Sequence, residues 1–340
     1  MPEVPMEVLV DKHENLHLIG KGATNYSLKN VSYETDYDEV LEKYGESDLS
    51  RAFKIAQDMG AKYIFLMNLK NSYDYFDVKE VIRQEDFTYI VPVSIYMSDT
   101  FTDFSKDGAK ISLVAYLLSL ISEDNSESVI MATDKHASLY EDLDAFKEDM
   151  DAAEKLFTAS CGAGMNMENI CFVANNLQKT DMANVVAAAA LCIADVPEYP
   201  EFAYGKAIFD IDTFDTSGNW AYFCNHSDGS SSIENMVNFL ERQPEKIISI
   251  SRIIKMIKRE LDFSEFCGKN YSEYQRMRFE RKLDAYLAQL TGYVIYKYQI
   301  ISVKAYKNIH HKGTVTMKAV FDVWPVNCLE RCHVEKGVNI

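Results

Sequence analysis

Two short stretches combine residue types that could carry out acid–base or nucleophilic chemistry. Asp210-Ile211-Asp212 places two carboxylates on one face of a predicted strand, which would suit a metal ion or an acid–base pair. Ser160-Cys161-Gly162-Ala163-Gly164 places a thiol in a Gly-flanked turn after a predicted helix, where a nucleophile could lie. Neither stretch has a partner group placed by the sequence, so a solvated strand edge and a helix-ending loop explain them more simply.

A third stretch, Gly20-x-Gly22-x-x-Asn25, has part of the pattern of a dinucleotide-binding turn. The third glycine is absent, however, and residues 26–29 do not begin a convincing helix. A phosphate site needs the amides of the helix N-terminus that follows the glycines. The stretch is therefore better explained as a turn at the end of a strand.

The cysteines indicate free thiols. The seven cysteines are odd in number, scattered, and mostly placed between apolar residues, which is typical of buried thiols in a reducing compartment. Cys328-x-x-x-Cys332-His333 has a spacing that suits zinc, but a fourth ligand has no obvious source. Cysteines in a strand explain this motif better. The sequence thus predicts no catalytic residue, no cofactor and no metal ion.

Charge divides the chain into two parts of opposite sign. The net charge is −17, yet residues 246–340 hold 17 basic and 9 acidic side chains, and residues 1–245 hold 18 basic and 43 acidic ones. Three interpretations are open: a nucleic-acid-binding C-terminal part, attraction between copies of the chain, or docking of the basic part on an acidic partner. The usual nucleic-acid-binding motifs are not found, and the large acidic part opposes phosphate binding.

Composition predicts a well-cored protein that does not enter a membrane. The chain has 340 residues, of which 47% are hydrophobic and 26% charged, enough for two ordinary domains. No apolar run reaches the roughly 18 residues that a membrane span requires. The first residues have neither a basic start nor an apolar signal core, so we expect no export by a standard signal.

Residues 16–200 alternate predicted strands with predicted helices. The strands are apolar on both faces, which is typical of a mainly parallel sheet covered by helices on both sides. Such an α/β fold would also suit a nucleotide- or flavin-binding enzyme. The predicted strands are 16–22, 61–69, 87–95, 129–133 and 170–174, and the predicted helices are 37–44, 47–60, 77–84, 108–122, 139–159 and 180–194.

The last third of the chain is expected to form a separate α+β domain. Residues 201–245 are rich in loop formers, with strand candidates at 206–211 and 220–225. A basic amphipathic helix starts at Glu245, and after a break at 262–270 a second helix runs from Tyr271 to Leu290. The residues available to its buried face are Tyr274, Met277, Leu283, Tyr286, Leu287 and Leu290. Thr291-Gly292 ends that helix. Residues 293–306 and 314–324 predict a β-hairpin, and residues 329–340 a further extended stretch.

This order of basic helix, aromatic break, helix, glycine and strand resembles the C-terminal domain of contractile tail sheath proteins, which occur in contractile-tailed bacteriophages, phage-tail-like bacteriocins and related injection machines. The first half is similar to the same family. Leu16 to Gly22 resembles its first core strand, and Leu49 to Ala61 resembles its step from a helix through Gly-Ala into a strand. The order of these motifs, over most of the chain, carries the resemblance. The chain resembles a short form of these sheath proteins, which lacks large inserted domains.

The resemblance implies a division of the chain into five segments. These are an N-terminal arm at 1–15, an acidic outer α/β domain at 16–200, an irregular connection at 201–245, a basic tube-facing α+β domain at 246–328, and a C-terminal arm at 329–340.

The resemblance also implies roles for particular residues. In the family the terminal strands are exchanged between subunits, and here neither terminal strand has an obvious local partner. Such a strand adds about five main-chain hydrogen bonds, each worth about 0.5–1.5 kcal/mol. The implied arm residues are Val8, Val10, Cys332, Val334, Val338 and Ile340, and the implied tube-facing cations are Lys255, Lys258, Arg259, Arg276, Arg278, Arg281 and Lys282.

The function implied is structural and not enzymatic. A sheath subunit polymerises as stacked rings, hexameric in the family, around an inner tail tube protein, meets baseplate and tail-terminator proteins, and contracts to drive the tube through a bacterial envelope. It is assembled in the bacterial cytoplasm and belongs to a virion or a phage-tail-like particle. The α/β enzyme and the basic nucleic-acid binder remain as alternatives. Stabilisation by a nucleotide or flavin would favour the enzyme, and salt-sensitive retention on phosphate would favour the binder.

Overall fold

The chain folds into two compact units, of which the first comprises residues 1–194 and 200–240 and the second residues 195–199 and 241–340. No helix in the described ranges is both long and apolar enough to cross a bilayer. The computed structural model describes residues 15–26, 30–69, 88–103, 109–123, 128–161, 165, 167–177, 180–193, 219–225, 231–235, 237–238, 248–292, 294–307, 315–325 and 332–339.

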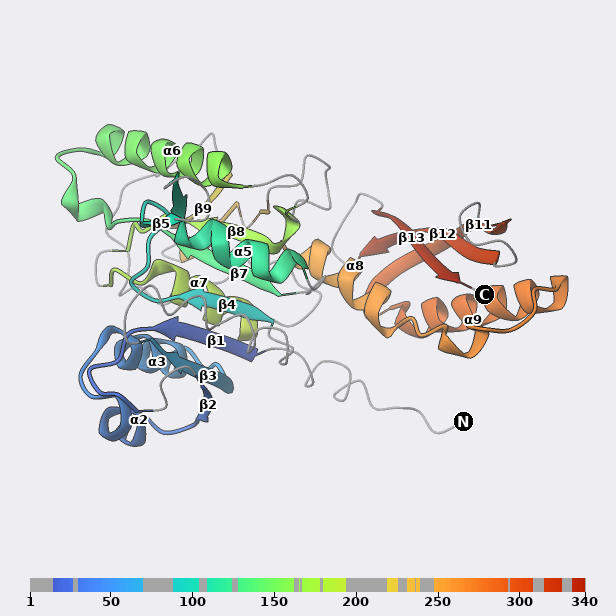
Figure 1. The fold of residues 1–340 in the computed structure, drawn as a ribbon, viewed down its shortest axis with the longest axis horizontal. Coiled ribbons are helices and arrows are strands. Elements are labelled where there is room, and N and C mark those ends of the chain that lie inside the picture. The colour runs from blue at the N-terminus through green and yellow to red at the C-terminus, as the bar shows by residue number, and fades with distance from the viewer. Residues whose placement is uncertain are drawn as a thin grey trace. The chain divides into compact units, whose positions relative to one another are not determined.

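A mainly parallel sheet forms the centre of the first unit (Figure 1). Over the described residues it has eight strands in the order β10-β9-β8-β7-β4-β1-β3-β2. The six inner strands are parallel, and β2 and β10 pair antiparallel at the two edges. The predicted mainly parallel sheet is therefore confirmed. The strands are β1 (Asn15–Gly20), β2 (Val31–Glu34), β3 (Tyr63–Asn68), β4 (Tyr89–Pro92), β7 (Val129–Thr133), β8 (Ile170–Val173), β9 (Trp220–Asn225) and β10 (Ser231–Glu234).

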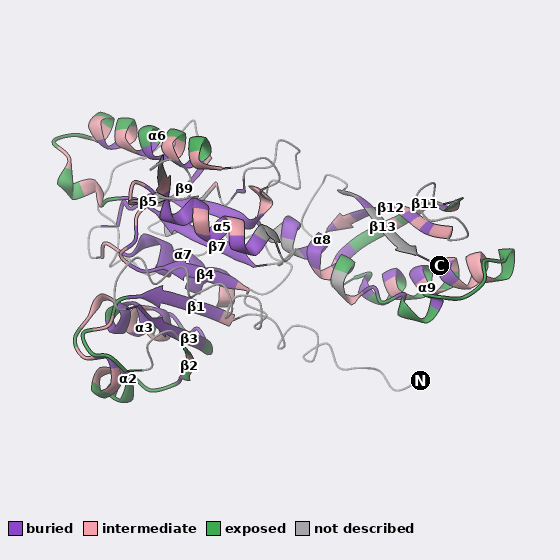
Figure 2. Cartoon of the chain, viewed as in Figure 1, coloured by how far each residue is buried: buried purple, intermediate pink, exposed green. Residues whose placement is uncertain are grey.

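Helices cover both faces of this sheet, which is why its inner strands are apolar throughout. α3 (Asp48–Asp58) and α7 (Ala183–Ile193) pack against β1 on one face. α5 (Leu113–Glu123) and α6 (Leu143–Ser160) share a buried cluster with Ile19, Ile90 and Ile130 on the other face. Figure 2 shows the strands buried and the outer side of α6 exposed.

Local capping signals define the two helices between β2 and β3. α2 (Tyr37–Tyr44) begins where the Asp36 carboxylate accepts hydrogen bonds from the Asp38 and Glu39 amides, and it ends at Gly45, whose φ of 69° suits a residue without a Cβ. α3 begins with a capping box between Ser47 and Ser50. The predicted helices at 37–44 and 47–60 are thus confirmed, with α3 ending at Asp58.

Two predictions in this unit are wrong. Residues 108–122 do not form one helix, because Ala109–Ser112 is β6, which pairs antiparallel with β5 (Thr100–Asp103) before α5 begins. The Ser112 hydroxyl accepts from the Ala115 amide and so marks the real start of the helix. Residues 231–234 form β10 instead of a loop, because they complete the edge beside β9. The predicted helix 77–84 and strand 206–211 lie outside the described residues.

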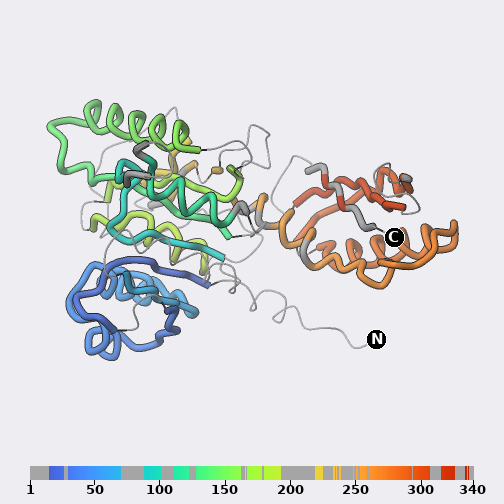
Figure 3. Tube along the Cα trace, in the orientation of Figure 1, coloured from blue at the N-terminus to red at the C-terminus, as the bar shows by residue number. Residues whose placement is uncertain are grey.

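The second unit packs two helices against a three-stranded antiparallel sheet of order β11-β12-β13 (Figure 3). α8 (Ile248–Glu260) and α9 (Glu273–Leu290) are joined by a break that contains the short 3₁₀ helix η5 (Ser264–Phe266). The strands are β11 (Ile295–Lys307), β12 (Val315–Pro325) and β13 (Cys332–Asn339). The predicted pair of helices and the predicted hairpin are confirmed. The core lies between one face of the sheet and the apolar sides of both helices.

Candidate functional site: the helices and edge strands of the second unit

An aromatic cluster fixes the break between α8 and α9. The ring of Phe279 lies 3.8 Å, centroid to centroid, from that of Phe263 and 5.5 Å from that of Phe266. All three rings are buried. Since Phe279 belongs to α9 and the other two rings belong to the break, the cluster holds the start of α9 against the end of α8.

Glu265 gathers two of the predicted tube-facing cations. Its carboxylate lies 3.0 Å from the Arg278 guanidinium and 3.0 Å from the Lys282 ammonium. The hydrogen bond from Lys282, helped by the charge of Arg278, lowers the pKa of Glu265 below its usual value. Arg278 also lies 5.6 Å from the centroid of the Phe266 ring, within cation–π range. Both cations are thus partly satisfied within the unit.

Arg276 is held by the acidic residues of its own helix. Its guanidinium lies 2.7 Å from Glu273 and 2.9 Å from Glu280, one turn away on either side. These carboxylates raise the pKa of Arg276, with the hydrogen bond to Glu273 as the largest cause. The charge of this arginine is therefore largely balanced by its neighbours.

The remaining predicted cations differ in how far they reach solvent. Lys255 is only 8% exposed, so it adds little to the outer charge of α8. Lys258 and Arg281 are exposed, and no carboxylate of the described part of the chain forms an ion pair with either. The side chain of Arg259 lies outside the described residues. The seven predicted cations therefore do not form one free basic patch. Of the seven, Lys258 and Arg281 are the most accessible to a binding partner.

The start of α9 exposes apolar side chains that the sequence pattern assigned to the core. Tyr274 is 68% exposed and Met277 43% exposed, so their predicted burial is wrong. The predicted burial of Leu283, Leu287 and Leu290 is confirmed, and with Phe279 they form a buried stripe at helical spacing. Tyr274 and Met277 lie off that stripe, and they form an exposed surface at the start of the helix together with Tyr271, which is 40% exposed.

The C-terminal strand has a partner within its own chain. β13 pairs antiparallel with β12 from Cys332 opposite Val323 to Asn339 opposite Thr316, and Val334 is fully buried in the core. The expectation that this strand lacks a local partner is therefore wrong. The alternation of polar and apolar residues in this strand is short and is interrupted by an inward-facing lysine. It therefore did not identify β12 as the neighbouring strand. Val8, Val10 and Ile340 lie outside the described residues.

β11 and β13 form the two edges of this sheet. β11 is long, and register shifts occur between Ile295 and Lys297 and between Ile300 and Ser302. The residues skipped at these bulges, Tyr296 and Ile301, are 74% and 49% exposed. Bulges on an edge strand interrupt the regular row of main-chain groups that a random strand would join. Both edges remain places where a further strand of suitable register could pair.

The glycine-rich exit of β1 is occupied by protein groups. The Gly22 amide donates to Oδ1 of Asn68 at 2.8 Å, and Nδ2 of Asn68 donates to the carbonyls of Thr24 and Tyr26 at 3.0 and 2.9 Å. A Cβ on Gly20 would lie 2.8 Å from the Cβ of Val93. The glycines thus allow close packing at the end of a strand, as the turn interpretation predicts, and the Gly22 amide is not free for a phosphate.

The other candidate chemical groups are not assembled into a site in the described residues. Cys161 ends α6, and burial raises the pKa of its thiol to about 11, which disfavours a nucleophilic thiolate. Among the described residues, no group of three His, Cys, Asp or Glu side chains could hold a metal ion. Asp210, Asp212, Cys328 and residues 162–164 lie outside those residues.

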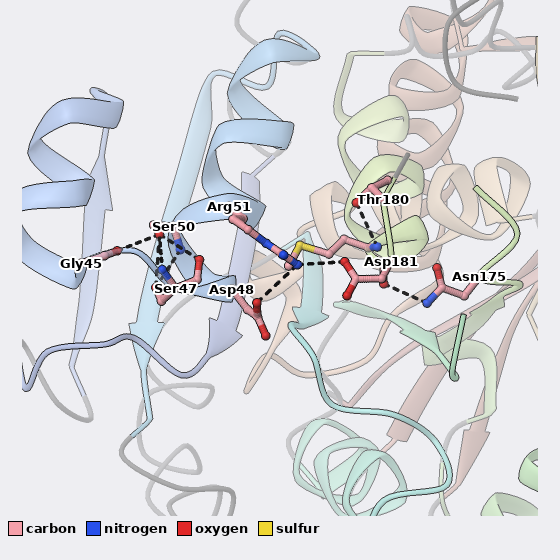
Figure 4. Close-up of polar contacts among 9 residues, drawn as sticks. Gly45, Ser47, Asp48, Ser50, Arg51, Asn175, Thr180 and Asp181 are labelled. Carbon is pink, nitrogen blue, oxygen red and sulfur yellow. Dashed lines mark hydrogen bonds and ion pairs between the residues drawn. The ribbon is translucent and has the colours of Figure 1, made fainter. Parts of the chain in front are cut away.

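A polar network lies instead at the ends of β7 and β8, and Figure 4 shows the part of it that reaches α3. Asn175 donates to the main-chain carbonyls of Asp134 and Asp181, and the Asp181 carboxylate lies 2.9 Å from the Arg51 guanidinium of α3. Burial raises the pKa of Asp134, which accepts from both the amide and the hydroxyl of Ser98. These contacts tie the helix-entry loops to the sheet.

Solved structures share this fold over nearly the whole chain. A sheath tail protein from Desulfitobacterium hafniense is 13% identical with a TM-score of 0.64, and the match covers 96% of this chain and 97% of that one. For a sheath tail protein from Listeria innocua the identity is 10%, the TM-score 0.62 and the coverage 98% of each chain. The sheath complex of an extracellular contractile injection system, in its contracted state, is 12% identical with a TM-score of 0.60, covering 89% of this chain and 84% of that one.

The sequence itself matches no protein-family model and no curated protein. The likeness is therefore one of fold. It includes both compact units and the order in which they follow each other along the chain. The resemblance to sheath proteins that the motif order predicted is confirmed at the level of the fold.

Proposed function

We propose that this protein is a structural, non-enzymatic subunit of a contractile tail sheath. In this role it polymerises as stacked rings around an inner tube and contracts to drive the tube through a bacterial cell envelope. The observation that carries the proposal is the shared fold over 96% of this chain and 97% of a sheath tail protein, without a large inserted domain on either side.

The proposed partners follow from this role. Other copies of the chain form the rings, for which we propose sixfold symmetry, and the inner tube protein, the baseplate and the tail terminator complete the particle. Structures with the same fold include an anti-feeding prophage helical sheath and a six-fold symmetrised baseplate of the same particle. We place the protein in a virion or a phage-tail-like particle, assembled in the bacterial cytoplasm, where it would serve genome ejection or bacteriocin action.

We further propose that β13 is exchanged between copies in the assembled sheath. The strand lies at an edge of its sheet and is the last described element, so the same strand from a neighbouring copy could form the same pairs with β12. Val8 and Val10 of the N-terminal arm would pair at an edge of a neighbour's sheet. The main-chain hydrogen bonds would keep the copies joined while the sheath shortens.

The inner surface would be formed by α8 and α9, which carry the proposed tube-facing cations. Lys258 and Arg281 are the exposed cations of this set without a partner carboxylate among the described residues. They would therefore contribute most to binding an acidic tube surface. Exposed charge pairs are worth about 0–1 kcal/mol each, so this contact would be weak enough to release on contraction.

Electron microscopy of the purified, concentrated chain tests the proposal. We expect tubes with regular cross-striations from the stacked rings. When the cognate tube protein is co-expressed, the double variant Lys258→Glu/Arg281→Glu should form sheath tubes that contain no inner tube. The control variant Lys304→Glu, which changes a lysine of β11, should form sheath tubes that still enclose the inner tube. Discrete small particles at every concentration, with or without the tube protein, would contradict the sheath role.

A further inference from the structure

The inward face of β13 contains a lysine. In the observed register, Val334 and Lys336 share the side of the sheet on which Val323, Phe321, Ala319 and Met317 lie. All four of these β12 residues are buried. Lys336 is only partly buried, and its ammonium still needs a polar partner wherever the apolar face of the sheet takes it out of water.

Lys336 finds that partner at the end of α8. Its ammonium group donates to the main-chain carbonyl of Lys258, in the last turn of the helix. The Asp262 amide, four residues after Lys258, donates to the Glu260 carbonyl at 2.8 Å instead. The lysine therefore takes a carbonyl left open at the negative end of the helix dipole.

The surroundings of this contact also favour a cation. Hydrogen bonds from Ser264 lower the pKa of Asp262, and the charges of Lys282 and Lys336 lower it further. The residue opposite Lys336 in the register is Ala319, whose side chain is small. Position 336 thus combines a small neighbour with an acceptor.

The apolar residues alone do not fix how β13 lies along β12. A slip of one residue would turn Val334 outward and is excluded by the core. A slip of two residues keeps the inward face inward, and it is opposed mainly by Lys336. It would bring the ammonium opposite Phe321 or Met317, both fully buried, and away from the Lys258 carbonyl.

We propose that Lys336 determines the register of the C-terminal strand, so that β12 accepts this strand in one alignment only. Where the strand comes from another copy, the inference rests on the proposed function, and the same lysine would then set the alignment between subunits. Within one chain it holds independently of assembly.

Disulfide trapping in the full-length protein tests the register. In the observed alignment Glu335 lies opposite Val320, whereas the slip that brings Lys336 opposite Met317 would bring Glu335 opposite Lys318. Cysteines at 320 and 335 report the first alignment and cysteines at 318 and 335 the second, because a disulfide requires Cα atoms about 4.4–6.8 Å apart. Peptide mapping by mass spectrometry identifies the engineered bond among the native cysteines.

With Lys336 in place, we expect the 320–335 disulfide to exceed the 318–335 disulfide by about tenfold or more, the effect of one charge-assisted hydrogen bond. Lys336→Met should bring the two yields to within about threefold, while Lys336→Arg and the control Lys304→Met should keep the preference. An unchanged preference in Lys336→Met would overturn the proposal.

A transposed variant tests the proposal if Lys336→Met fails to fold. Val334→Lys/Lys336→Val places the lysine two positions earlier, so β13 should shift until position 334 lies opposite Ala319. The main disulfide should then move to the 318–335 pair, and its persistence at 320–335 would overturn the proposal.

Isotope labelling separates the register from the exchange of strands. In an equal mixture of ¹⁵N-labelled and unlabelled chains that assemble together, complete strand exchange would give about half of the disulfides a mixed mass, and pairing within single chains would give none. The absence of mixed-mass bonds would count against strand exchange. The choice between the two cysteine pairs would still test the role of Lys336.

Discussion

The carboxylate of Glu265 lies 3.0 Å from the guanidinium of Arg278, across the break that joins α8 to α9. The same carboxylate lies 3.0 Å from Lys282. The basic character of the second unit is therefore partly balanced from within. The cations still available to a partner at this surface, Lys258 and Arg281 among them, lie on two different helices.

The aromatic cluster beneath this ion pair should stabilise the second unit far more than the ion pair does. Phe279→Ala removes a fully buried ring and should lower the free energy of unfolding by about 3–5 kcal/mol. Glu265→Ala should lower it far less, because the paired side chains are more than a third exposed. Trp324 reports this unit in a Trp220→Phe background, since the chain has two tryptophans. Equal losses in urea unfolding would contradict the account.

Asn68 should be essential to the turn after β1. Asn68→Ala leaves the Gly22 amide and the carbonyls of Thr24 and Tyr26 without their partner, and we expect a loss of about 2–4 kcal/mol in the free energy of unfolding. Asn25→Ala changes an exposed residue of the same turn and serves as the control. Urea unfolding followed through Trp220, in a Trp324→Phe background, measures both. A similar stability for the two variants would be inconsistent with this role.

The network of Figure 4 allows a comparison between a buried amide and an exposed ion pair. Asn175 is 1% exposed, and Asn175→Ala deprives two main-chain carbonyls of their donor, which should cost about 2–3 kcal/mol. Arg51→Ala removes an ion pair whose side chains are 54% and 42% exposed and should cost less than about 1 kcal/mol. Thermal unfolding of both variants distinguishes them, and the reverse order of stability would show that the ion pair dominates.

Thiol reactivity should separate buried Cys171 from exposed Cys267. Burial raises the pKa of Cys171 to about 12, so this thiol should resist alkylation at about pH 8 in the folded protein, whereas exposed Cys267 should react quickly. Peptide mapping after a short exposure to iodoacetamide measures both. Equal rates would mean that β8 opens readily.

The raised pKa of Cys171 also predicts how stability depends on alkaline pH. The folded thiol keeps its proton to higher pH than the unfolded one, whose ordinary pKa is 9.0. The contribution of this group is therefore complete below about pH 9 and is lost as the pH rises above it. Cys171→Ala should show a smaller decline in the free energy of unfolding above that pH, and an unchanged decline would contradict the assignment.

The sequence identified the strands of the parallel sheet well where both faces are buried. Residues 129–133 are apolar almost throughout, and β7 spans the same residues. The helices with clear end signals, such as Asp36 and Gly45 around α2, were also placed correctly. The order of the strands was beyond prediction, because β1 lies between β3 and β4 through contacts far apart in the chain.

The surfaces of the second unit were harder to predict. Helical periodicity identified Lys255 as part of a basic face, yet tertiary packing leaves it 8% exposed. The pattern did not distinguish Phe279, which is in the core, from Tyr274 and Met277, which are exposed, because all are apolar and closely spaced on one helix. Lys336 of β13 donates to a main-chain carbonyl of α8, and composition gives no sign of such a contact.

Sedimentation velocity of the full chain over a wide range of concentration tests the central claim, that this protein polymerises as a sheath subunit. The sheath account predicts a mass that keeps growing with concentration and does not stop at a small oligomer. A single monomeric species at every concentration, with β13 paired only to β12 of its own chain, would contradict it.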